Sequence, residues 1–341
     1  PSDLVVIAGS SFVGTPALED YLAEKAEYDP VVVDVEDIYN SVGHGMALPG
    51  AITDYLSARH ELYPFRHVQL VGTDCYDRHN YVSGCVSFVP LPTAEVGVTR
   101  FSPSHNRIAD LDGDGVADVA IAQFSVRTED ELQTIVDKGR TWSFSGLSAG
   151  GSVLLIAEES DGDHDFLSQV TRVGRRLDAA FEDVLDMSAH PDILTAREAL
   201  RTALDDGRSV TVFSGHSSAI QWDYRGLLTP AGVAALTNVD APTLVLPLAC
   251  ETSYDISPTA NVLGHQLMYA GEQGALAISG AVSLANLDDN ERMANHILSG
   301  LAAGATLGEA VQAGREALGA MYQALQDNWL TQGDVTLKLE R

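Results

Sequence analysis

Cysteine, lysine and long apolar runs are all scarce in this chain of 341 residues. Its three cysteines are too few for a disulfide scaffold, and a chain of this length can bury a core of its own. No stretch approaches the roughly 18 uninterrupted apolar residues that a membrane-spanning helix requires. With 45% apolar residues, the composition is that of a globular protein of one large or two ordinary domains.

Positive charge is scarce as well. The chain has 20 basic against 48 acidic residues, a net charge of −28, and its lysines are Lys25, Lys138 and Lys338. Such a surface repels nucleic acid phosphates and anionic lipids, so we expect neither as a partner. A salt-tolerant surface and an ordinary acidic secreted protein are equally good interpretations. The chain opens on strand-like residues with no leader pattern. We expect a secreted or cell-surface protein, from which a signal or propeptide would then have been removed.

The three cysteines fall into a pair and a single residue. Cys75 and Cys85 lie ten residues apart in a segment with glycine and asparagine, where they could form a disulfide. A metal site made of Cys75, His79 and Cys85 lacks a fourth ligand at the usual spacing. We interpret His79 and His44 as loop residues. Cys250 is left without a partner.

Short apolar runs alternate with longer helix-like stretches, as in a mostly parallel sheet covered by helices. The predicted strands are Leu4–Ala8, Val31–Val35, Val68–Val71, Ala117–Gln123, Ser152–Ala157, Ser209–Phe213, Thr243–Leu248, Gly274–Ser279 and Val335–Leu339. The alternation restarts after a helix over 128–142, which begins with the capping signature Thr128-Glu129-Asp130-Glu131. We therefore divide the chain into two α/β subdomains, 1–141 and 142–341, with residues 75–106 as a long excursion.

The strongest chemical signal is a histidine and a cysteine at two successive strand ends. His216 follows the strand at 209–213, and Cys250 follows the strand at 243–248. Open α/β sheets place their active sites at the carboxyl ends of their strands. If these strands are neighbours, an imidazole and a thiol share one crevice, as a base and a nucleophile must. The pattern favours a cysteine nucleophile over its alternative, a buried structural cysteine and a loop histidine.

The motifs around these residues resemble those of gingipain-type (C25) cysteine peptidases of the caspase-like clan. They are Phe213-Ser214-Gly215-His216-Ser217, followed by Trp222, and Leu248-Ala249-Cys250-Glu251-Thr252. Other segments resemble that family in the same order, namely Asp112–Ala120 with Val126-Arg127-Thr128 and Glu131, then 274–280, then Trp329 with Gly333-Asp334-Val335-Thr336-Leu337. The resemblance implies two caspase-like, Rossmann-like subdomains with mostly parallel sheets and helices on both faces.

The resemblance also implies an activity, a cysteine endopeptidase that acts on protein or peptide substrates through a thioester without a catalytic cofactor. Cys250 would be the nucleophile and His216 the general acid and base. Glu158 would be the acidic residue beside the histidine, with Glu159 as second choice. The backbone N–H groups of Cys250 and Ser217 would bind the oxyanion, although the family has glycine at the position of Ser217. The oligomeric state is left open.

Substrate specificity follows less directly from the resemblance. Arginine-specific members carry an aspartate at the floor of the P1 pocket, and Asp165 matches it by position, with Asp161 and Asp163 in the same loop. We therefore expect a preference for basic P1 residues, although the tryptophan that caps the pocket in those members is absent here. Trp222 in the histidine motif and Ser279 in the strand flanking the pocket complete the substrate-binding candidates.

Two other functions remain as alternatives. Gly146-Leu147-Ser148-Ala149-Gly150 satisfies the G-x-S-x-G pattern of serine hydrolases, with His216 after it in the expected order. That pattern must follow a strand and begin a helix, whereas here the strand-like run comes after it. A serine hydrolase using Ser148 is thus the weaker alternative. The other is a catalytically inactive caspase-like domain retained for binding or assembly.

The residues from 110 to 118 have the spacing of a calcium loop, with glycine at the sixth position. The candidate ligands are Asp110, Asp112, Asp114, Val116 and Asp118. The twelfth position is Ile121 instead of the usual glutamate, and no helix is predicted before the loop. A structural calcium ion and a simple charged turn both remain open.

Overall fold

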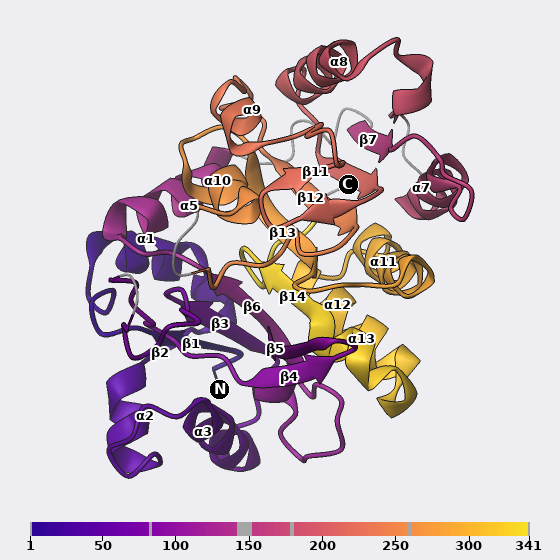
Figure 1. Ribbon diagram of the computed structural model, residues 1–341. Helices are drawn as coiled ribbons and strands as arrows, with labels where there is room; N and C mark the ends of the chain where they lie inside the picture. Colours follow the sequence, from indigo (N-terminus) through magenta and orange to yellow (C-terminus); the bar gives the residue numbers. More distant parts are fainter. Residues whose placement is uncertain (1, 82–83, 142–151, 178–180, 258–260, 340–341) are drawn as a thin grey trace.

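The computed structural model describes residues 2–81, 84–141, 152–177, 181–257 and 261–339, which form an α/β architecture (Figure 1). In this described part, ten strands form one sheet in the order β2-β1-β3-β6-β14-β13-β12-β9-β7-β8. Neighbouring strands are parallel except β13 and β14, which are antiparallel. Parallel strands need crossover connections, and these place helices on both faces. The predicted fold class is confirmed.

Residues before 142 supply one half of this sheet, with strands β1 (Leu4–Ala8), β2 (Val31–Asp34), β3 (His67–Val71) and β6 (Ala120–Phe124). The helices of this part are α1 (Pro16–Glu24), α2 (Val35–Ser41), α3 (Pro49–Leu62), α4 (Asn106–Ala109) and α5 (Glu129–Thr141). Strands β4 (Thr93–Val96) and β5 (Thr99–Pro103) form a separate hairpin. Leu4 and Val6 of β1 pack in the same core as Leu18 of α1. Val5, between them, packs in the other core with Ile52 of α3. Alternate residues of a strand point to opposite faces, so helices α1 and α5 cover one face of the sheet and α2 and α3 the other (Figure 1).

Residues from 152 onward supply the strands of the other half, which are β7 (Ser152–Ala157), β8 (Phe181–Asp186), β9 (Val210–Ser214), β12 (Thr243–Leu248) and β13 (Ala275–Ala281). Strands β10 (Ser217–Ser218) and β11 (Gln221–Trp222) form a separate pair. The helices of this part are α7 (Phe166–Gly174), α8 (Ile193–Asp205), α9 (Pro230–Ala234), α10 (Leu263–Tyr269), α11 (Leu287–Ala302), α12 (Leu307–Leu318) and α13 (Gln323–Asn328). Short 3-10 helices cover Ala26–Tyr28, Arg175–Leu177, Met187–Ala189 and Ala320–Tyr322. Among the residues that the structure describes, no helix has the length and apolar composition that crossing a bilayer requires.

Strand β14 (Trp329–Gln332) joins the two halves, because it pairs antiparallel with β13 and parallel with β6. The prediction of a last strand at 335–339 was wrong. That segment makes only an isolated bridge between Lys338 and Thr306, and its apolar side chains are buried without strand pairing. The boundary predicted near residue 141 falls between α5 and β7, within one continuous sheet.

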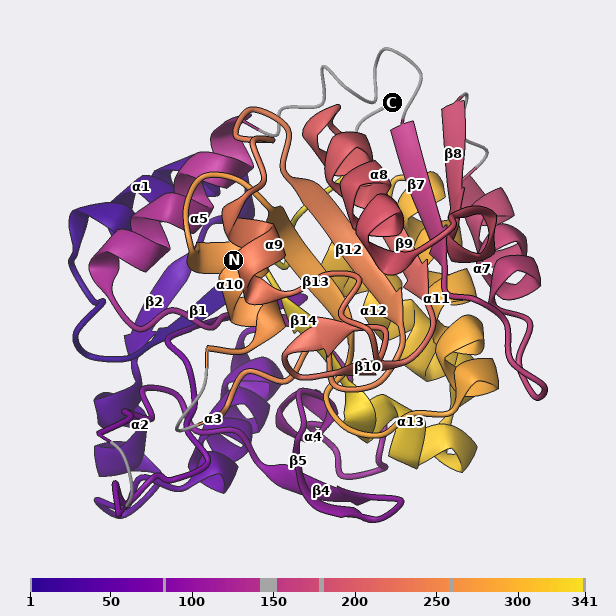
Figure 2. The same ribbon diagram turned by 45° about the horizontal axis from the view of Figure 1, so that its top comes forward.

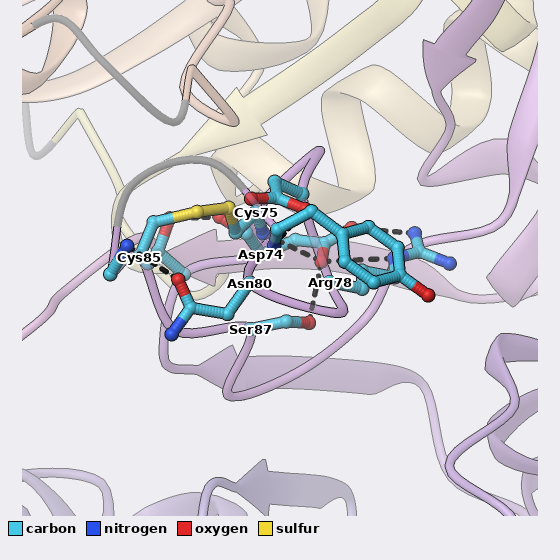
Figure 3. The surroundings of a disulfide bond; sticks show 10 residues. Asp74, Cys75, Arg78, Asn80, Cys85 and Ser87 are labelled. Atoms are coloured by element: carbon cyan, nitrogen blue, oxygen red, sulfur yellow. Dashed lines mark hydrogen bonds and ion pairs between the residues drawn. A yellow bond between two sulfur atoms is a disulfide. The ribbon is translucent and has the colours of Figure 1, made fainter.

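A disulfide closes the first part of the excursion that leaves the sheet after β3. It joins Cys75 and Cys85, whose Cα atoms are 6.2 Å apart (Figure 3). The buried carboxylate of Asp74 lies beside it and accepts hydrogen bonds from Ser87 Oγ at 2.6 Å and from the guanidinium of Arg78 at 2.7 Å. The excursion is therefore held by a covalent bond and by a buried, fully partnered carboxylate.

Candidate active site

Strands β12, β9 and β7 lie side by side in the sheet (Figure 2). Their register aligns the last residue of β12 with the last of β9, and the last of β9 with the last of β7. Cys250 and His216 each come two residues after these aligned ends, and Glu158 comes one residue after. The three predicted residues therefore leave the same edge of the sheet from three adjacent strands, where α/β folds place their sites.

Glu158 orients the imidazole of His216. The Nδ1–H of His216 donates to Oε2 of Glu158 at 3.1 Å, and the backbone N–H of His216 donates to the same oxygen. Because Nδ1 carries the proton in this arrangement, Nε2 keeps a lone pair that can accept a proton. Burial raises the pKa of Glu158, and the charge of Asp223 adds to the rise, while contacts with His216 oppose it. Glu159, the second choice, instead forms an exposed ion pair with Arg225 at 3.2 Å.

Gly215 makes this close contact sterically possible. A Cβ at residue 215 would lie 2.6 Å from Oε2 and 2.7 Å from Cβ of Glu158. It would also lie 2.8 Å from the ring of Phe213. The histidine motif therefore needs glycine at 215, because the carboxylate approaches the backbone there.

Aromatic rings restrict the other sides of the His216 ring. Tyr224 lies 4.7 Å away between ring centroids, Phe166 lies 5.4 Å away edge-on, and His164 lies 6.2 Å away edge-on. The imidazole still keeps 29% of its surface exposed. It is thus held in one orientation and remains accessible to a ligand.

Cys250 carries a free, half-buried thiol. Burial raises the pKa of this thiol, and the backbone N–H of Ala285, 3.4 Å from Sγ, lowers it. The carbonyl oxygen of Cys250 accepts a hydrogen bond from Ser217 Oγ, which itself accepts one from Thr252 Oγ1 at 3.3 Å. The hydroxyl that replaces the expected glycine at 217 therefore ties the loop of the histidine to the loop of the cysteine.

The predicted specificity residue, Asp165, is an exposed helix cap. Its carboxylate accepts hydrogen bonds from the backbone N–H and Oγ of Ser168 at 3.0 and 2.6 Å, and these bonds lower its pKa. It does not form a buried pocket floor in this structure, because both oxygens serve the first turn of α7 at the surface. Asp161 of the same loop lies close to His216, with Oδ2 3.9 Å from Nε2 of the imidazole.

The buried polar residue of α7 next to these strands is Gln169, which the sequence reasoning missed. Its Oε1 accepts a hydrogen bond from Ser214 Oγ at 2.6 Å, and its Nε2 donates to the carbonyl of Leu287 at 2.9 Å. The amide thus connects the end of β9 with the start of α11. It has no charge or motif that could have singled it out in the sequence.

Two predicted substrate-binding residues, Ser279 and Trp222, lie in the core. Ser279 is fully buried, and its Oγ lies 2.8 Å from Thr331 Oγ1 and accepts from Trp329 Nε1 at 2.8 Å. Trp222 is 1% exposed and stacks on Phe213, with ring centroids 4.6 Å apart. Neither side chain reaches a surface that a substrate could contact here, so they support the strands instead. The G-x-S-x-G motif at 146–150 lies outside the described residues.

A pocket of about 390 Å³ has Glu251, the residue after Cys250, in its wall. The lining residues are Tyr76, Thr99, Arg100, Phe101, Ser102, Pro103, Ala219, Glu251, Tyr254, Val282 and Ser283. Glu251 has a φ of 55°, which is uncommon for a residue with a side chain, and its backbone N–H donates to Ser283 O at 3.2 Å. Its carboxylate accepts from the backbone N–H of Ala219 at 3.2 Å. The sequence did not indicate this pocket, because only the fold brings β5 and Glu251 to the same cavity.

The predicted calcium loop keeps three carboxylates together. Oxygens of Asp110, Asp112 and Asp118 all lie within 4.8 Å of one another. Burial raises the pKa of Asp110; two backbone N–H groups of the loop oppose this rise, and the nearby carboxylates add to it. Contrary to expectation, a short helix, α4, directly precedes the loop, and Ile121 at the twelfth position is buried in β6. The donor set is that of a hard cation such as calcium, and the site stays a prediction.

Comparisons with known proteins agree with this geometry. The sequence profile of peptidase family C25 matches residues 1–340. The fold is similar to the Arg-specific cysteine proteinase gingipain R (RgpB), with a TM-score of 0.79 and 17% identity over 99% of this chain and 78% of that one. It is similar to the Porphyromonas gingivalis RgpB pro- and mature-domain complex, with a TM-score of 0.78 and 17% identity over 98% and 79% of the two chains. A third structure, described only as a protease, has a TM-score of 0.73 and 16% identity over 99% of this chain and 78% of that one. A search of curated proteins finds no match.

The structural similarities, at this low identity, establish a shared fold. The family profile spans nearly the whole chain, including the strands that carry Cys250, His216 and Glu158. The chain therefore belongs to peptidase family C25 and is a gingipain-type cysteine peptidase.

Proposed function

We propose that this peptidase cleaves internal peptide bonds of proteins by covalent catalysis with Cys250 and His216. The observation that carries the proposal is the hydrogen bond from Nδ1–H of His216 to Glu158. It leaves Nε2 as the proton acceptor at the sheet edge where Cys250 also emerges. A base oriented by a third group beside a nucleophile is the arrangement that acyl transfer requires.

The reaction would proceed in two halves through a thioester. Burial raises the pKa of the Cys250 thiol, so Nε2 of His216 takes its proton as Sγ bonds to the scissile carbonyl carbon. The oxyanion would accept hydrogen bonds from the backbone N–H groups of Cys250 and Ser217. When the C–N bond breaks, the imidazolium gives its proton to the leaving amine. Water, deprotonated by Nε2, then attacks the thioester, releasing the acid and restoring the thiol.

The first test replaces Cys250 with alanine. Cys250→Ala should lower kcat by about 10³-fold or more while circular dichroism stays unchanged, because the change only shortens one side chain at a strand end. Ser148→Ala is the matched control, since the G-x-S-x-G alternative requires that hydroxyl. Full activity of Cys250→Ala, or loss of activity in Ser148→Ala alone, would overturn the proposed mechanism.

We also propose a preference for basic P1 residues, supported by the acidic loop that faces His216 and by the Arg specificity of the similar gingipain R. The carboxylates of Asp161, Asp163 and Asp165 are exposed. Exposed charges are screened by salt, so we expect a preference of about tenfold, falling at high ionic strength. Arginine should lead lysine, because its planar fork can bind a carboxylate bidentately.

A P1 peptide library tests this preference on the parent and on the Asp165→Asn and Asp161→Asn variants, at low and high salt. A larger loss in Asp161→Asn than in Asp165→Asn would assign the role to the carboxylate nearer His216. A parent that prefers acidic or large apolar P1 residues would contradict the proposal.

We propose an oxidising location, at the cell surface or outside the cell. The support is the disulfide between Cys75 and Cys85, since such bonds persist where thiols are not kept reduced. Mass spectrometry of the protein purified from its own source, with alkylation before reduction, tests this location. Full alkylation of both cysteines without reduction would contradict it.

A further inference from the structure

Three side chains that can ligate a metal meet at the exposed side of the catalytic imidazole. They are Asp161, His164 and His216, and each offers one ligand atom within 4.8 Å of the other two. Oδ2 of Asp161 lies 3.9 Å from Nε2 of His216, and Oδ1 of Asp161 lies 3.2 Å from Nδ1 of His164. This cluster is separate from the calcium loop, and its two nitrogens and one oxygen are a different donor set.

The spacing suits a tetrahedral ion of zinc type. Zinc binds histidine nitrogen and carboxylate oxygen at about 2.0–2.2 Å, which places tetrahedral ligands roughly 3.4 Å apart. The Asp161 carboxylate approaches His164 through Oδ1 at 3.2 Å and His216 through Oδ2 at 3.9 Å. All three ligand atoms lie within 4.8 Å of one another, so small side-chain rotations would bring them to that spacing. Two imidazoles and one carboxylate favour zinc over calcium or magnesium, which prefer oxygen ligands only.

The surroundings hold two of the three ligands in place before any ion arrives. Oδ1 of Asp161 accepts the backbone N–H groups of Asp163 and His164, both at 2.8 Å. Glu158 accepts Nδ1–H of His216, which is how a carboxylate orients a metal-binding imidazole and fixes its tautomer. His164 stacks on Phe166, with ring centroids 5.6 Å apart.

The cluster is also reachable from solvent. The exposed fractions of the Asp161, His164 and His216 side chains are 43%, 39% and 29%. An ion can therefore enter without opening the fold, and water can occupy the fourth position that three protein ligands leave open.

We propose that Asp161, His164 and His216 form a zinc site that reversibly switches the peptidase off. An ion on Nε2 of His216 occupies the lone pair that must accept the thiol proton, so the bound enzyme cannot begin acyl transfer. The metal site itself is independent of the mechanism, whereas the inhibition rests on the proposed function.

Metal binding is tested first on the inactive Cys250→Ala variant, with calcium in excess to fill the aspartate loop. Titration with Co²⁺, followed by its visible absorption, and calorimetry with Zn²⁺ should show one site whose affinity falls at least about tenfold in Cys250→Ala/His164→Ala. The matched control is Cys250→Ala/His296→Ala, since His296 is an exposed histidine of α11 outside the cluster. Equal affinities in all three proteins, or no binding, would overturn the site.

Inhibition is tested next on the active enzyme. Zn²⁺ should abolish hydrolysis and a zinc chelator should restore it. In His164→Ala the inhibitory concentration, measured relative to that variant's own metal-free activity, should rise at least about tenfold. If zinc binds to Cys250→Ala but does not inhibit the parent enzyme, the metal site would stand and the proposed switch would be refuted. A parent without peptidase activity would contradict the proposed function alone, because the binding test does not depend on it.

Discussion

Glu158 and His216 are joined twice, since one carboxylate oxygen accepts both the backbone N–H and the Nδ1–H of the histidine. The carboxylate belongs to the loop after β7 and the histidine to the loop after β9, so the pairing of two adjacent strands sets the orientation of the base. The proposed mechanism depends on this relationship more than on any other contact.

Replacing Glu158 with glutamine should lower kcat by about a hundredfold with little change in KM. The amide is neutral, so it stabilises the imidazolium less and no longer selects the tautomer with a free Nε2. Steady-state kinetics would measure the loss. Glu159→Gln is the control and should behave as the parent, because Glu159 pairs with Arg225 at the surface. Equal effects of the two substitutions would remove the orienting role of Glu158.

Gly215→Ala should also reduce kcat, by about tenfold or more, because its Cβ would meet the Glu158 carboxylate at 2.6 Å and push it away from His216. Gly139→Ala, where a Cβ meets no atom within 4 Å, should leave both kinetics and stability close to the parent. Full activity of Gly215→Ala would show that the two hydrogen bonds between His216 and Glu158 are dispensable.

Removal of calcium should lower the melting temperature if the Asp110–Asp118 loop binds it. An ion present at a hundred times its dissociation constant stabilises the folded state by about 2.7 kcal/mol, which is several degrees for a chain of this size. Asp112→Asn should reduce the effect, while Asp54→Asn on α3 should not. An unchanged melting curve with excess chelator, after the metal content is checked, would remove the site.

Asp255 should make stability fall as the pH rises from about 4 to 7. Its carboxyl is 1% exposed, and burial raises its pKa to about 7, with Ser125 opposing the shift and Asp74 adding to it. A raised carboxyl pKa means that the folded state binds its proton more tightly than the unfolded state does, so stability is lost as pH climbs through that window.

Asp255→Asn should therefore stabilise the protein at pH 8 by about 1–3 kcal/mol, with a gain that disappears near pH 4. Denaturant unfolding at both pH values measures it, and Asp54→Asn at an exposed position is the control. A gain that is the same at pH 4 and pH 8 would assign the effect to packing rather than to charge.

The sequence predicted the fold where burial is continuous. Strands β1, β9 and β12 are mostly apolar runs whose residues are all buried, and they lie within one residue of the predicted ranges. The start of α5 is also confirmed, because Thr128 Oγ1 accepts the N–H of Glu131 at 3.2 Å.

Other elements were missed for identifiable reasons. The edge strand β8 contains three acidic residues in six, which hides its pattern. Helix α8 carried a usable signal, since Ala196, Leu200 and Leu204 are buried at a spacing of four and Asp192 caps its start. The segment 335–339 has alternating apolar residues, but its place beyond β14 gives them burial without strand partners.

The residues of the candidate site also fall into those that the sequence could indicate and those that it could not. Cys250 and His216 could be found because strand ends and motifs carry them. The exposure of Asp165, the neutral Gln169 and the proximity of Asp161 to His216 depend on how α7 and its loop pack against β9, which sequence spacing does not encode.

The central claim, that Cys250 is the nucleophile, is tested most directly by labelling the enzyme with an arginine chloromethylketone and mapping the modified peptide by mass spectrometry. We predict one label per chain, on Sγ of Cys250, with labelling lost in His216→Ala and activity lost in proportion to label bound. A label on Ser148, or inactivation with Cys250 unmodified, would contradict the account.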